Sequence, residues 1–156
     1  MEFLEELNML AEAGRWQDVC EALERSIQAE SDQGVKIGRL MLRANVLEKR
    51  LVDLAGARRD WRRILEIDPG NGSALEALER IYRLAEDWPA LIELLERKAK
   101  LVAKPRKRAL QIARCARICW DNLQDAAKTR ALCQQALALD PKNAEALALA
   151  DELLER

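Results

Sequence analysis

The sequence predicts an all-α fold: a right-handed α-α superhelix, or solenoid, of about four helical hairpins followed by a terminal helix. The main reason is an internal repeat, because residues 14–84 align without a gap on residues 86–156, at an offset of 72 residues. A fixed period is typical of stacked architectures, in which each unit buries its apolar face against its neighbours. The composition agrees, since 34% of the residues are charged and only six are Gly, which favours long helices over a sheet.

The two aligned copies share landmark residues. Trp16 in the first copy aligns on Trp88 in the second, and both copies contain an Asp-Pro pair, at residues 68–69 and 140–141. Proline disfavours helical geometry in the residue before it, so each pair ends a helix. Each copy therefore holds four helices, and the 3.6-residue apolar period predicts one more helix before the first copy.

The predicted helices form one domain over residues 1–156, which is long enough to bury a real core. Every connection between them is short, so successive helices are expected to pack antiparallel. The hairpins are predicted over residues 1–31, 34–67, 71–103 and 106–139, and a final helix is predicted over residues 142–156.

Local signals justify the first two hairpins. Gly14 is a suitable C-terminal stop for the first helix, and apolar residues at helical spacing define the next three helices. The inward stripes comprise Trp16, Val19, Cys20, Leu23 and Ile27 in the second helix, Ile37, Leu40, Met41, Ala44 and Leu47 in the third, and Leu54, Ala57, Trp61, Ile64 and Leu65 in the fourth.

Capping residues mark the later helices. Asn71, Asp87 and Asn143 each stand where a side chain can accept a hydrogen bond from the first amides of a helix. Pro89 is tolerated in the first turn of the sixth helix. The inward stripes comprise Ala74, Leu75, Leu78, Ile81 and Tyr82 in the fifth helix, and Ile112, Ala113, Ala116, Trp120 and Leu123 in the seventh.

An alanine and a closing proline recur on the second helices of hairpins, with Ala57, Trp61, Ile64 and Pro69 in the first copy and Ala136 and Pro141 in the second. This pattern resembles the tetratricopeptide repeat (TPR) family, whose unit is a helix pair of about 34 residues. Tyr82 and Trp120 stand where that family keeps the aromatic residue of its first helix. The resemblance covers nearly the whole chain, and it implies that the first helix of each hairpin lines a concave, peptide-binding groove.

The resemblance is to divergent bacterial versions of the repeat. Glu48 replaces the aromatic residue of one first helix, Arg117 occupies a position that is usually small, and Cys133 replaces a second-helix aromatic residue. The copies also exchange bulk, since Glu48 is matched with Trp61 in the first copy and Trp120 with Cys133 in the second. We expect the members of each pair to face each other, because cores tolerate volume-conserving exchanges best.

The sequence carries no recognisable catalytic machinery. It contains no histidine, which is the commonest general base and metal ligand. Its one Gly-x-Gly motif, at residues 70–72, follows a helix rather than a strand, unlike a phosphate-binding loop. We therefore expect a protein that is not an enzyme and that binds no cofactor.

Three cysteines admit two interpretations. Cys115 and Cys119 are four residues apart on one helix and Cys133 lies on the next, so three thiolates can be brought together around a soft metal ion. No fourth ligand is evident, and Cys119 and Cys133 fall at packing positions, where a thiol acts as a small hydrophobe. Core packing is favoured, and no metal site is predicted.

The basic run Lys98–Arg108 supports an alternative function, the binding of nucleic acid or an anionic surface, together with the arginines of the fourth helix. The run lacks the interleaved aromatic residues that stack on bases. The net charge of the chain is only -1, which offers no long-range attraction to polyanions. A solvated loop is the favoured interpretation, and nucleic acid is not an expected partner.

The groove that the resemblance implies is the better candidate for function. Its residues outside the packing stripes mix guanidinium groups with apolar side chains, and guanidinium groups bind carboxylates bidentately. We therefore expect a scaffold or adaptor whose partner is a protein or peptide, acidic in character. The candidate partner-binding residues are Arg39, Leu42, Arg43, Val46, Arg80, Arg83, Arg114 and Ile118.

The terminal helices are apolar around much of their circumference, as Phe3 and Leu4 at one end and Leu147 and Leu154 at the other illustrate. Exposed apolar patches mark interfaces. Either the chain is an excerpt of a longer repeat array, or its terminal helices associate with another copy.

Targeting signals favour the cytoplasm. Residues 1–6 lack the basic start of a signal peptide, and no apolar stretch reaches the ~18 residues that a membrane span needs. Four cysteines without a secretion signal are typical of reduced thiols.

Overall fold

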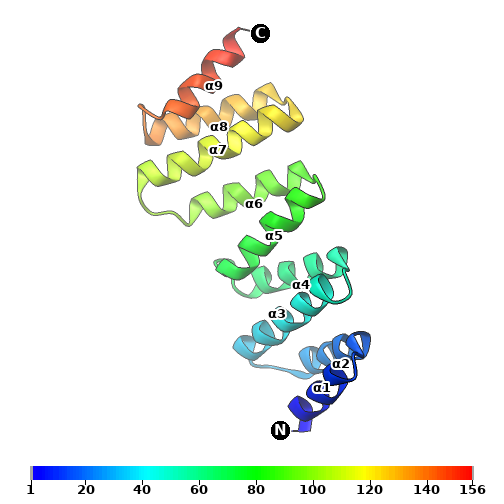
Figure 1. Cartoon of the computed structure of the whole chain (residues 1–156). Helices are drawn as coiled ribbons and strands as arrows, with labels where there is room; N and C mark the ends of the chain where they lie inside the picture. Colours follow the sequence, from blue (N-terminus) through cyan, green and yellow to red (C-terminus); the bar gives the residue numbers. More distant parts are fainter. Residues whose placement is uncertain (1, 156) are drawn as a thin grey trace. The chain divides into compact units, whose positions relative to one another are not determined.

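The computed structural model of the chain describes residues 2–155, and within that range every regular element is a helix (Figure 1). The helices are α1 (Glu2–Glu12), α2 (Trp16–Ala29), α3 (Gln33–Lys49), α4 (Leu54–Ile67), α5 (Gly72–Leu84), α6 (Trp88–Lys100), α7 (Pro105–Leu123), α8 (Ala126–Leu139) and α9 (Ala144–Leu154). The all-α repeat class that the sequence predicts is confirmed. None of the described helices combines the length and apolar character that a membrane crossing requires.

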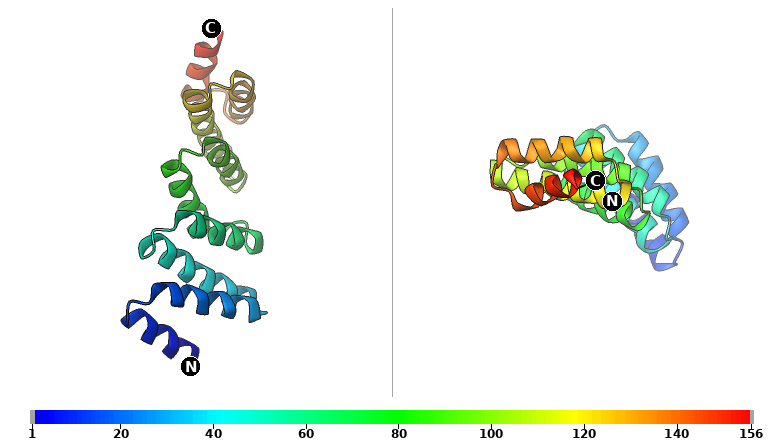
Figure 2. Two further views of the ribbon diagram at one scale, coloured as in Figure 1. Left: turned by 90° about the vertical axis from the view of Figure 1, so that its right-hand side faces the viewer. Right: turned by 90° about the horizontal axis from the view of Figure 1, so that it is seen from above.

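Contacts divide the chain into two compact units, the first ending at Leu78 and the second beginning at Glu79, so the boundary lies inside α5. In the first unit, α2 packs on α1 and α3, and α3 packs on α4. In the second unit, α7 packs on α6, α8 and α9, and α8 also packs on α9. Successive helices within each unit fold back on one another (Figure 2). That the whole chain forms a single domain stays a prediction.

The internal repeat reappears in the helix bounds and in the residues that cap them. Helices α4 and α8 begin and end at aligned positions. Asp53 accepts a hydrogen bond from the amide of Gly56 at 2.9 Å, and its counterpart Asp125 accepts one from the amide of Lys128 at 3.0 Å. A cap of this kind satisfies an amide that has no partner within the helix. These two helices therefore begin with the same aspartate cap in both copies of the repeat.

The caps predicted from the sequence are confirmed. The side chain of Asn71 accepts a hydrogen bond from the amide of Ala74 at 3.0 Å, and Asn143 accepts one from the amide of Ala146 at 2.9 Å. Asp87 accepts one from the amide of Ala90 at 3.3 Å.

Residues with the left-handed backbone conformation follow several helices, and they too occur at aligned positions of the two copies. Gly14 follows α1 with φ 71°, and its counterpart Glu86 has φ 53°. Val52, with φ 51°, is matched by Gln124, with φ 49°. A residue in this conformation turns the chain away from the helix and is most often glycine. The predicted stop at Gly14 is confirmed, whereas the other three turns use residues that adopt this conformation less readily.

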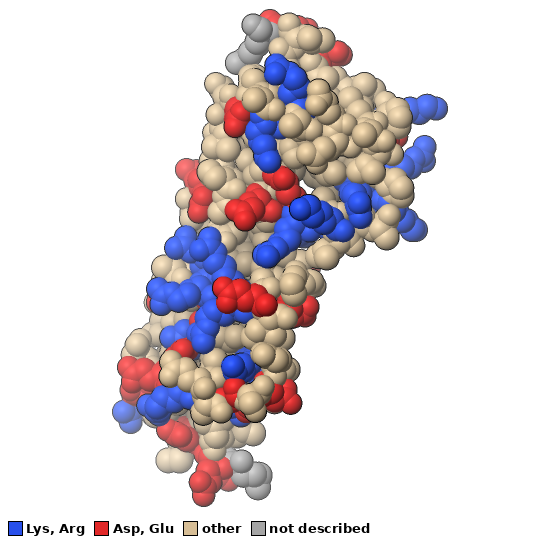
Figure 3. All heavy atoms as spheres, turned by 180° about the vertical axis from the view of Figure 1, so that it is seen from behind, with Lys and Arg blue, Asp and Glu red and all other residues tan. Residues whose placement is uncertain are grey.

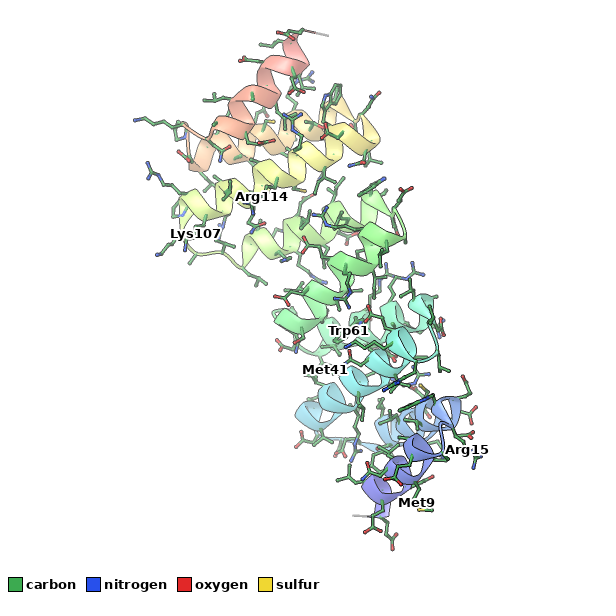
Figure 4. All side chains as sticks on the ribbon, viewed as in Figure 1. Met9, Arg15, Met41, Trp61, Lys107 and Arg114 are labelled. Carbon is green, nitrogen blue, oxygen red and sulfur yellow. The ribbon has the colours of Figure 1, made fainter. Side chains whose placement is uncertain are left out.

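Most residues of the predicted stripes lie in the core of their unit, whereas Trp16, Ile37, Met41 and Leu54 are half-buried. Fully buried side chains include Leu23, Leu40 and Ile64 in the first unit and Leu91, Cys115 and Leu132 in the second. Trp61, labelled in Figure 4, is buried on α4. The prediction was wrong for Leu123, which is 40% exposed because α7 ends there and the chain turns away at Gln124.

Candidate partner-binding faces

Arg39, the first predicted groove arginine, links α3 to the start of α1 and to the end of α2. It lies on α3, and its Nη1 is 3.1 Å from Oε2 of Glu30, the residue that ends α2. Its guanidinium also stacks 4.9 Å above the ring centroid of Phe3 on α1, a cation–π contact. Arg39 therefore already holds α1 and α2 in place, and any partner carboxylate has to compete with Glu30.

Arg43, the second predicted groove arginine, lies in an internal polar network. Its Nη1 is 2.7 Å from Oδ2 of the fully buried Asp60 on α4, and its Nε donates to the carbonyl oxygen of Cys20 on α2 at 3.2 Å. Arg63 reaches the same carboxylate at 3.2 Å and Oε2 of Glu24 at 2.9 Å. We call Glu24, Arg43, Asp60 and Arg63 the ion network of the first unit. Arg43 was predicted to face a partner, but its guanidinium is engaged inside the first unit by Asp60 and the carbonyl oxygen of Cys20.

Burial and charge pull the carboxylates of this network in opposite directions. Burial raises the pKa of Asp60, although the adjacent guanidinium groups of Arg43 and Arg63 act to lower it. Partial burial also acts to raise the pKa of Glu24, but its hydrogen bond and charge interaction with Arg63 outweigh this and leave the pKa below its usual value. The network is thus a structural device that joins α2, α3 and α4.

An apolar stripe on α3 remains open to solvent. Leu42, one of the predicted residues, is 46% exposed, whereas Val46 is buried and is not available to a partner. Val35 is 39% exposed, and helical spacing places it on the same face as Gly38 and Leu42. A methyl group added at Gly38 would meet nothing within 4 Å. This α3 stripe of Val35, Gly38 and Leu42 includes two residues that the sequence reasoning missed.

The predicted arginines of α5 lie on its exposed surface. Arg83 Nη2 is 3.6 Å from Oε1 of Glu79 one turn earlier, and half of the Arg83 side chain is exposed. An exposed pair of this kind contributes little to stability and yields readily to a competing anion. Arg80 is exposed as well.

The α7 stripe comprises Lys107, Leu110, Arg114 and the half-buried Ile118. Their spacing places them on one face of the helix, and Figure 4 labels Lys107 and Arg114 along it. Leu110 is 41% exposed. Within residues 2–155, neither Lys107 nor Arg114 forms an ion pair with this chain. Arg114 and Ile118 were predicted from the sequence, and Lys107 and Leu110 follow from the same spacing.

The basic run Lys98–Arg108 is partly used within the second unit. Lys98 Nζ is 3.3 Å from Oε2 of Glu79, and Arg108 donates from Nε to the carbonyl oxygen of Val102 at 2.8 Å. Lys104 and Arg106 remain exposed. Figure 3 shows lysine and arginine atoms gathered at the right-hand edge of the second unit. Lys98 therefore links α6 to α5, Arg108 fastens the connection between α6 and α7, and the other cations of the run face solvent.

The cysteines lie in the interior. Cys115, Cys119 and Cys133 are all buried, and Cys115 Sγ lies 3.6 Å from the carbonyl oxygen of Ile92, to which it can donate. Burial raises the pKa of Cys115 to about 12, so the thiol is protonated near neutral pH. Among the described residues, no group of three or more cysteine and carboxylate side chains is arranged to hold a metal ion.

Arg117 links the last helix to the second unit. It faces Glu152 on α9 with two parallel contacts of 2.9 and 3.1 Å, and its Nε is 2.9 Å from Oε1 of Glu145. These hydrogen bonds raise the pKa of Arg117. The large side chain at a position that the TPR resemblance expects to be small is thus explained by its bidentate pairing with α9.

Comparison with known proteins supports a TPR-like fold. No protein-family model matches the sequence, and no curated protein matches it. A crystal structure of MamA, a TPR-like helical repeat protein, is similar over 98% of this chain and 85% of its own, with 13% identity and a TM-score of 0.53. A structure described as "MamA RS-1 ArsTM double mutant" is similar over 92% of this chain and 76% of its own, with 14% identity and a TM-score of 0.52. Identity at this level shows a shared fold.

Proposed function

We propose that the protein is a non-enzymatic scaffold that binds a segment of a partner protein through the exposed faces of the first helices of its hairpins. The observation that carries this proposal is the α7 stripe, where Arg114 and Lys107 flank an exposed leucine and lack ion pairs with the described chain. By contrast, Arg43 and Arg117 are each satisfied by carboxylates of this protein.

The chemistry of the stripe specifies the kind of partner. A guanidinium group binds a carboxylate with two parallel hydrogen bonds, and a neighbouring apolar side chain adds burial to that contact. The α3 stripe of the first unit offers apolar surface without free cations. We infer that the second unit binds an acidic segment that also carries apolar residues, and that the first unit contributes apolar contacts of its own. A cytoplasmic location agrees with the sequence signals and is part of the proposal.

The test is an affinity capture of partners with matched variants of unchanged helicity. Leu110→Ser/Arg114→Glu alters the α7 stripe, and Lys104→Glu/Arg106→Glu alters the exposed part of the basic run. Arg130→Glu, on the exposed surface of α8, serves as the charge-change control. The expected result is that only the first variant loses protein partners from a nuclease-treated extract.

Equal recovery of the same proteins by all variants would contradict the proposal. Recovery of nucleic acid that depends on Lys104 and Arg106, and that falls steeply with added salt, would support the alternative function.

A further inference from the structure

A hollow between α6, α7 and α8 is not part of the α7 stripe. Its volume is about 310 Å³, at the lower end of the range of ligand sites. All of its lining belongs to the second unit, and the residues used below are Ala99, Lys100, Arg108, Ile112, Gln135 and Ala138. By helical periodicity, Arg108 and Ile112 lie on a different face of α7 from Lys107 and Arg114.

Three side chains that line the hollow are shorter than the residues aligned with them in the first copy of the repeat. Ala99, Gln135 and Ala138 align on Ile27, Arg63 and Glu66 of the first copy. In the first unit Ile27 is buried, and Arg63 crosses to Glu24 at 2.9 Å. At these positions the first unit carries a buried aliphatic group and an ion-paired guanidinium, whereas the second unit carries the smaller Ala99 and Gln135 beside the hollow.

The floor of the hollow is apolar. Ala99 and Ile112 are buried, and Leu139 is half-buried. Binding of an apolar group to such a surface is favourable, because it displaces water from apolar side chains.

The rim of the hollow is positive. Glu96, its one carboxylate, is matched by Lys128 at 2.7 Å. Arg108 donates to the carbonyl oxygens of Val102 and Lys100 at 2.8 and 3.2 Å, which leaves the other N–H groups of its guanidinium for a ligand. Lys100 is exposed and makes no ion pair within residues 2–155.

We propose that this hollow receives a leucine-sized aliphatic side chain from a partner protein, while an adjacent carboxylate of the same segment binds Lys100 and Arg108. The apolar floor selects the aliphatic group and the positive rim selects the carboxylate. The site is separate from the α7 stripe, so the proposal does not depend on the function proposed above.

The first unit supplies the variant that tests this site. Ala99→Ile/Gln135→Arg places first-copy side chains in the hollow, where the new arginine can pair with Glu96 as Arg63 pairs with Glu24. The probe is the peptide Ser-Glu-Leu-Leu-Glu-Ser, titrated into the chain of residues 1–156 while backbone amide shifts are followed by NMR. We expect shifts at Ala99, Ile112 and Leu139 in the wild-type protein. The affinity of the Ala99→Ile/Gln135→Arg protein, called the filled variant below, should be about 10- to 100-fold weaker.

Two controls make the result specific. The peptide Ser-Glu-Ala-Ala-Glu-Ser lacks the leucine side chains. The wild-type protein should therefore bind it as weakly as the Ala99→Ile/Gln135→Arg variant binds the leucine peptide. The Lys100→Glu variant should bind the acidic peptide more weakly than the wild type does. The same variant should regain binding to a peptide whose glutamates are replaced by lysines. This charge exchange keeps the test valid even if the filled variant folds poorly.

The proposal is overturned if millimolar acidic peptide leaves the hollow amides unshifted in the wild-type protein. It is equally overturned if the shifts persist in a well-folded Ala99→Ile/Gln135→Arg protein, or if the alanine peptide binds as tightly as the leucine peptide.

Discussion

The helices α2, α3 and α4 of the first unit and α6, α7 and α8 of the second unit follow one plan with different interiors. Arg43 donates to the carbonyl oxygen of Cys20 in the first unit, and at the aligned positions the thiol of Cys115 faces the carbonyl oxygen of Ile92. The buried Asp60 is matched by Leu132, which is also fully buried. The first copy thus places a buried ion network between its three helices, whereas the second places a thiol and a leucine at the positions of Arg43 and Asp60. The second copy keeps an ion pair between Lys128 on α8 and Glu96 on α6.

This difference teaches that the helix caps and the interior chemistry are specified separately. Asp53 and Asp125 cap their helices in the same way although the side chains beneath them differ. A buried ion network has to recover the cost of desolvation, whereas apolar packing of similar volume does not. The ion network therefore constrains how α2, α3 and α4 pack, because its charged groups must lie within contact distance of one another. It need not make the first unit more stable than apolar packing would.

The large aromatic rings allow the strongest test of the comparison. Trp61 lies on the second helix of its hairpin and Trp120 on the first helix of the corresponding hairpin, and both are buried. Trp61→Ala and Trp120→Ala are each expected to cost about 3–5 kcal/mol of unfolding free energy, measured by urea denaturation. Trp61→Phe should cost less, about 1.5 kcal/mol, because the buried Nε1 of Trp61 has no hydrogen-bond partner in the described chain. Small shifts for both alanine variants would contradict the proposed exchange of bulk between helices.

Removing one partner of the ion network is expected to cause the next largest loss of unfolding free energy. Asp60→Ala leaves Arg43 and Arg63 without their shared carboxylate, and the expected loss is about 3 kcal/mol. The matched variant Arg43→Cys/Asp60→Leu/Arg63→Gln installs the residues of the second copy and should be as stable as the wild type or more stable. Chemical denaturation of both variants measures the difference. If the triple variant were as unstable as Asp60→Ala, the two interiors would not be interchangeable.

The contact between Arg117 and α9 is expected to contribute less. Its carboxylate partners, Glu145 and Glu152, are each more than a third exposed, so Arg117→Ala should cost only about 1 kcal/mol. The loss should be local, and hydrogen exchange should quicken in α9 more than in α6. Asn45→Ala, at the aligned position of the first copy, is the control. Unchanged exchange in α9 would show that these ion pairs do not hold the helix.

The smallest effect concerns the thiol that replaces Arg43. Burial raises the pKa of Cys115 from 9.0 to about 12, so the unfolded chain ionises first as the pH rises. The stability that this shift contributes is complete below about pH 9 and is lost as the pH rises toward about 12. The stability difference between wild type and Cys115→Ala should therefore narrow as the pH rises from about 9 toward about 12. A difference that stays constant over this range would contradict the raised pKa.

Local sequence signals predicted most of the fold because each depends on residues close together in the chain. Asn71, Asp87 and Asn143 cap the helices that they were expected to cap, and Gly14 ends α1. Leu123 was misassigned to the core because the apolar period continues past the point where the backbone turns. Helical spacing cannot reveal that turn, which is made by Gln124 rather than by glycine.

The candidate sites were harder to predict because they depend on which helices meet. Arg43 and Asp60 are far apart in sequence, and only the antiparallel packing of α3 on α4 brings them to 2.7 Å. The α6–α8 hollow did leave a trace in the sequence, since Ile27 and Arg63 align on the shorter Ala99 and Gln135. Comparing side-chain sizes at aligned positions, rather than looking for identities, would have located it.

The boundary inside α5 has a consequence for how the chain unfolds. Most modular proteins place such boundaries in loops, where one module can melt without disturbing the next. Here melting of either unit has to stop within a helix, which leaves backbone carbonyl or amide groups without partners at the new end. Neighbouring repeats coupled through a shared helix propagate order as a one-dimensional lattice does. We therefore expect the stability of α5 to decide whether the two units melt in one transition or in two.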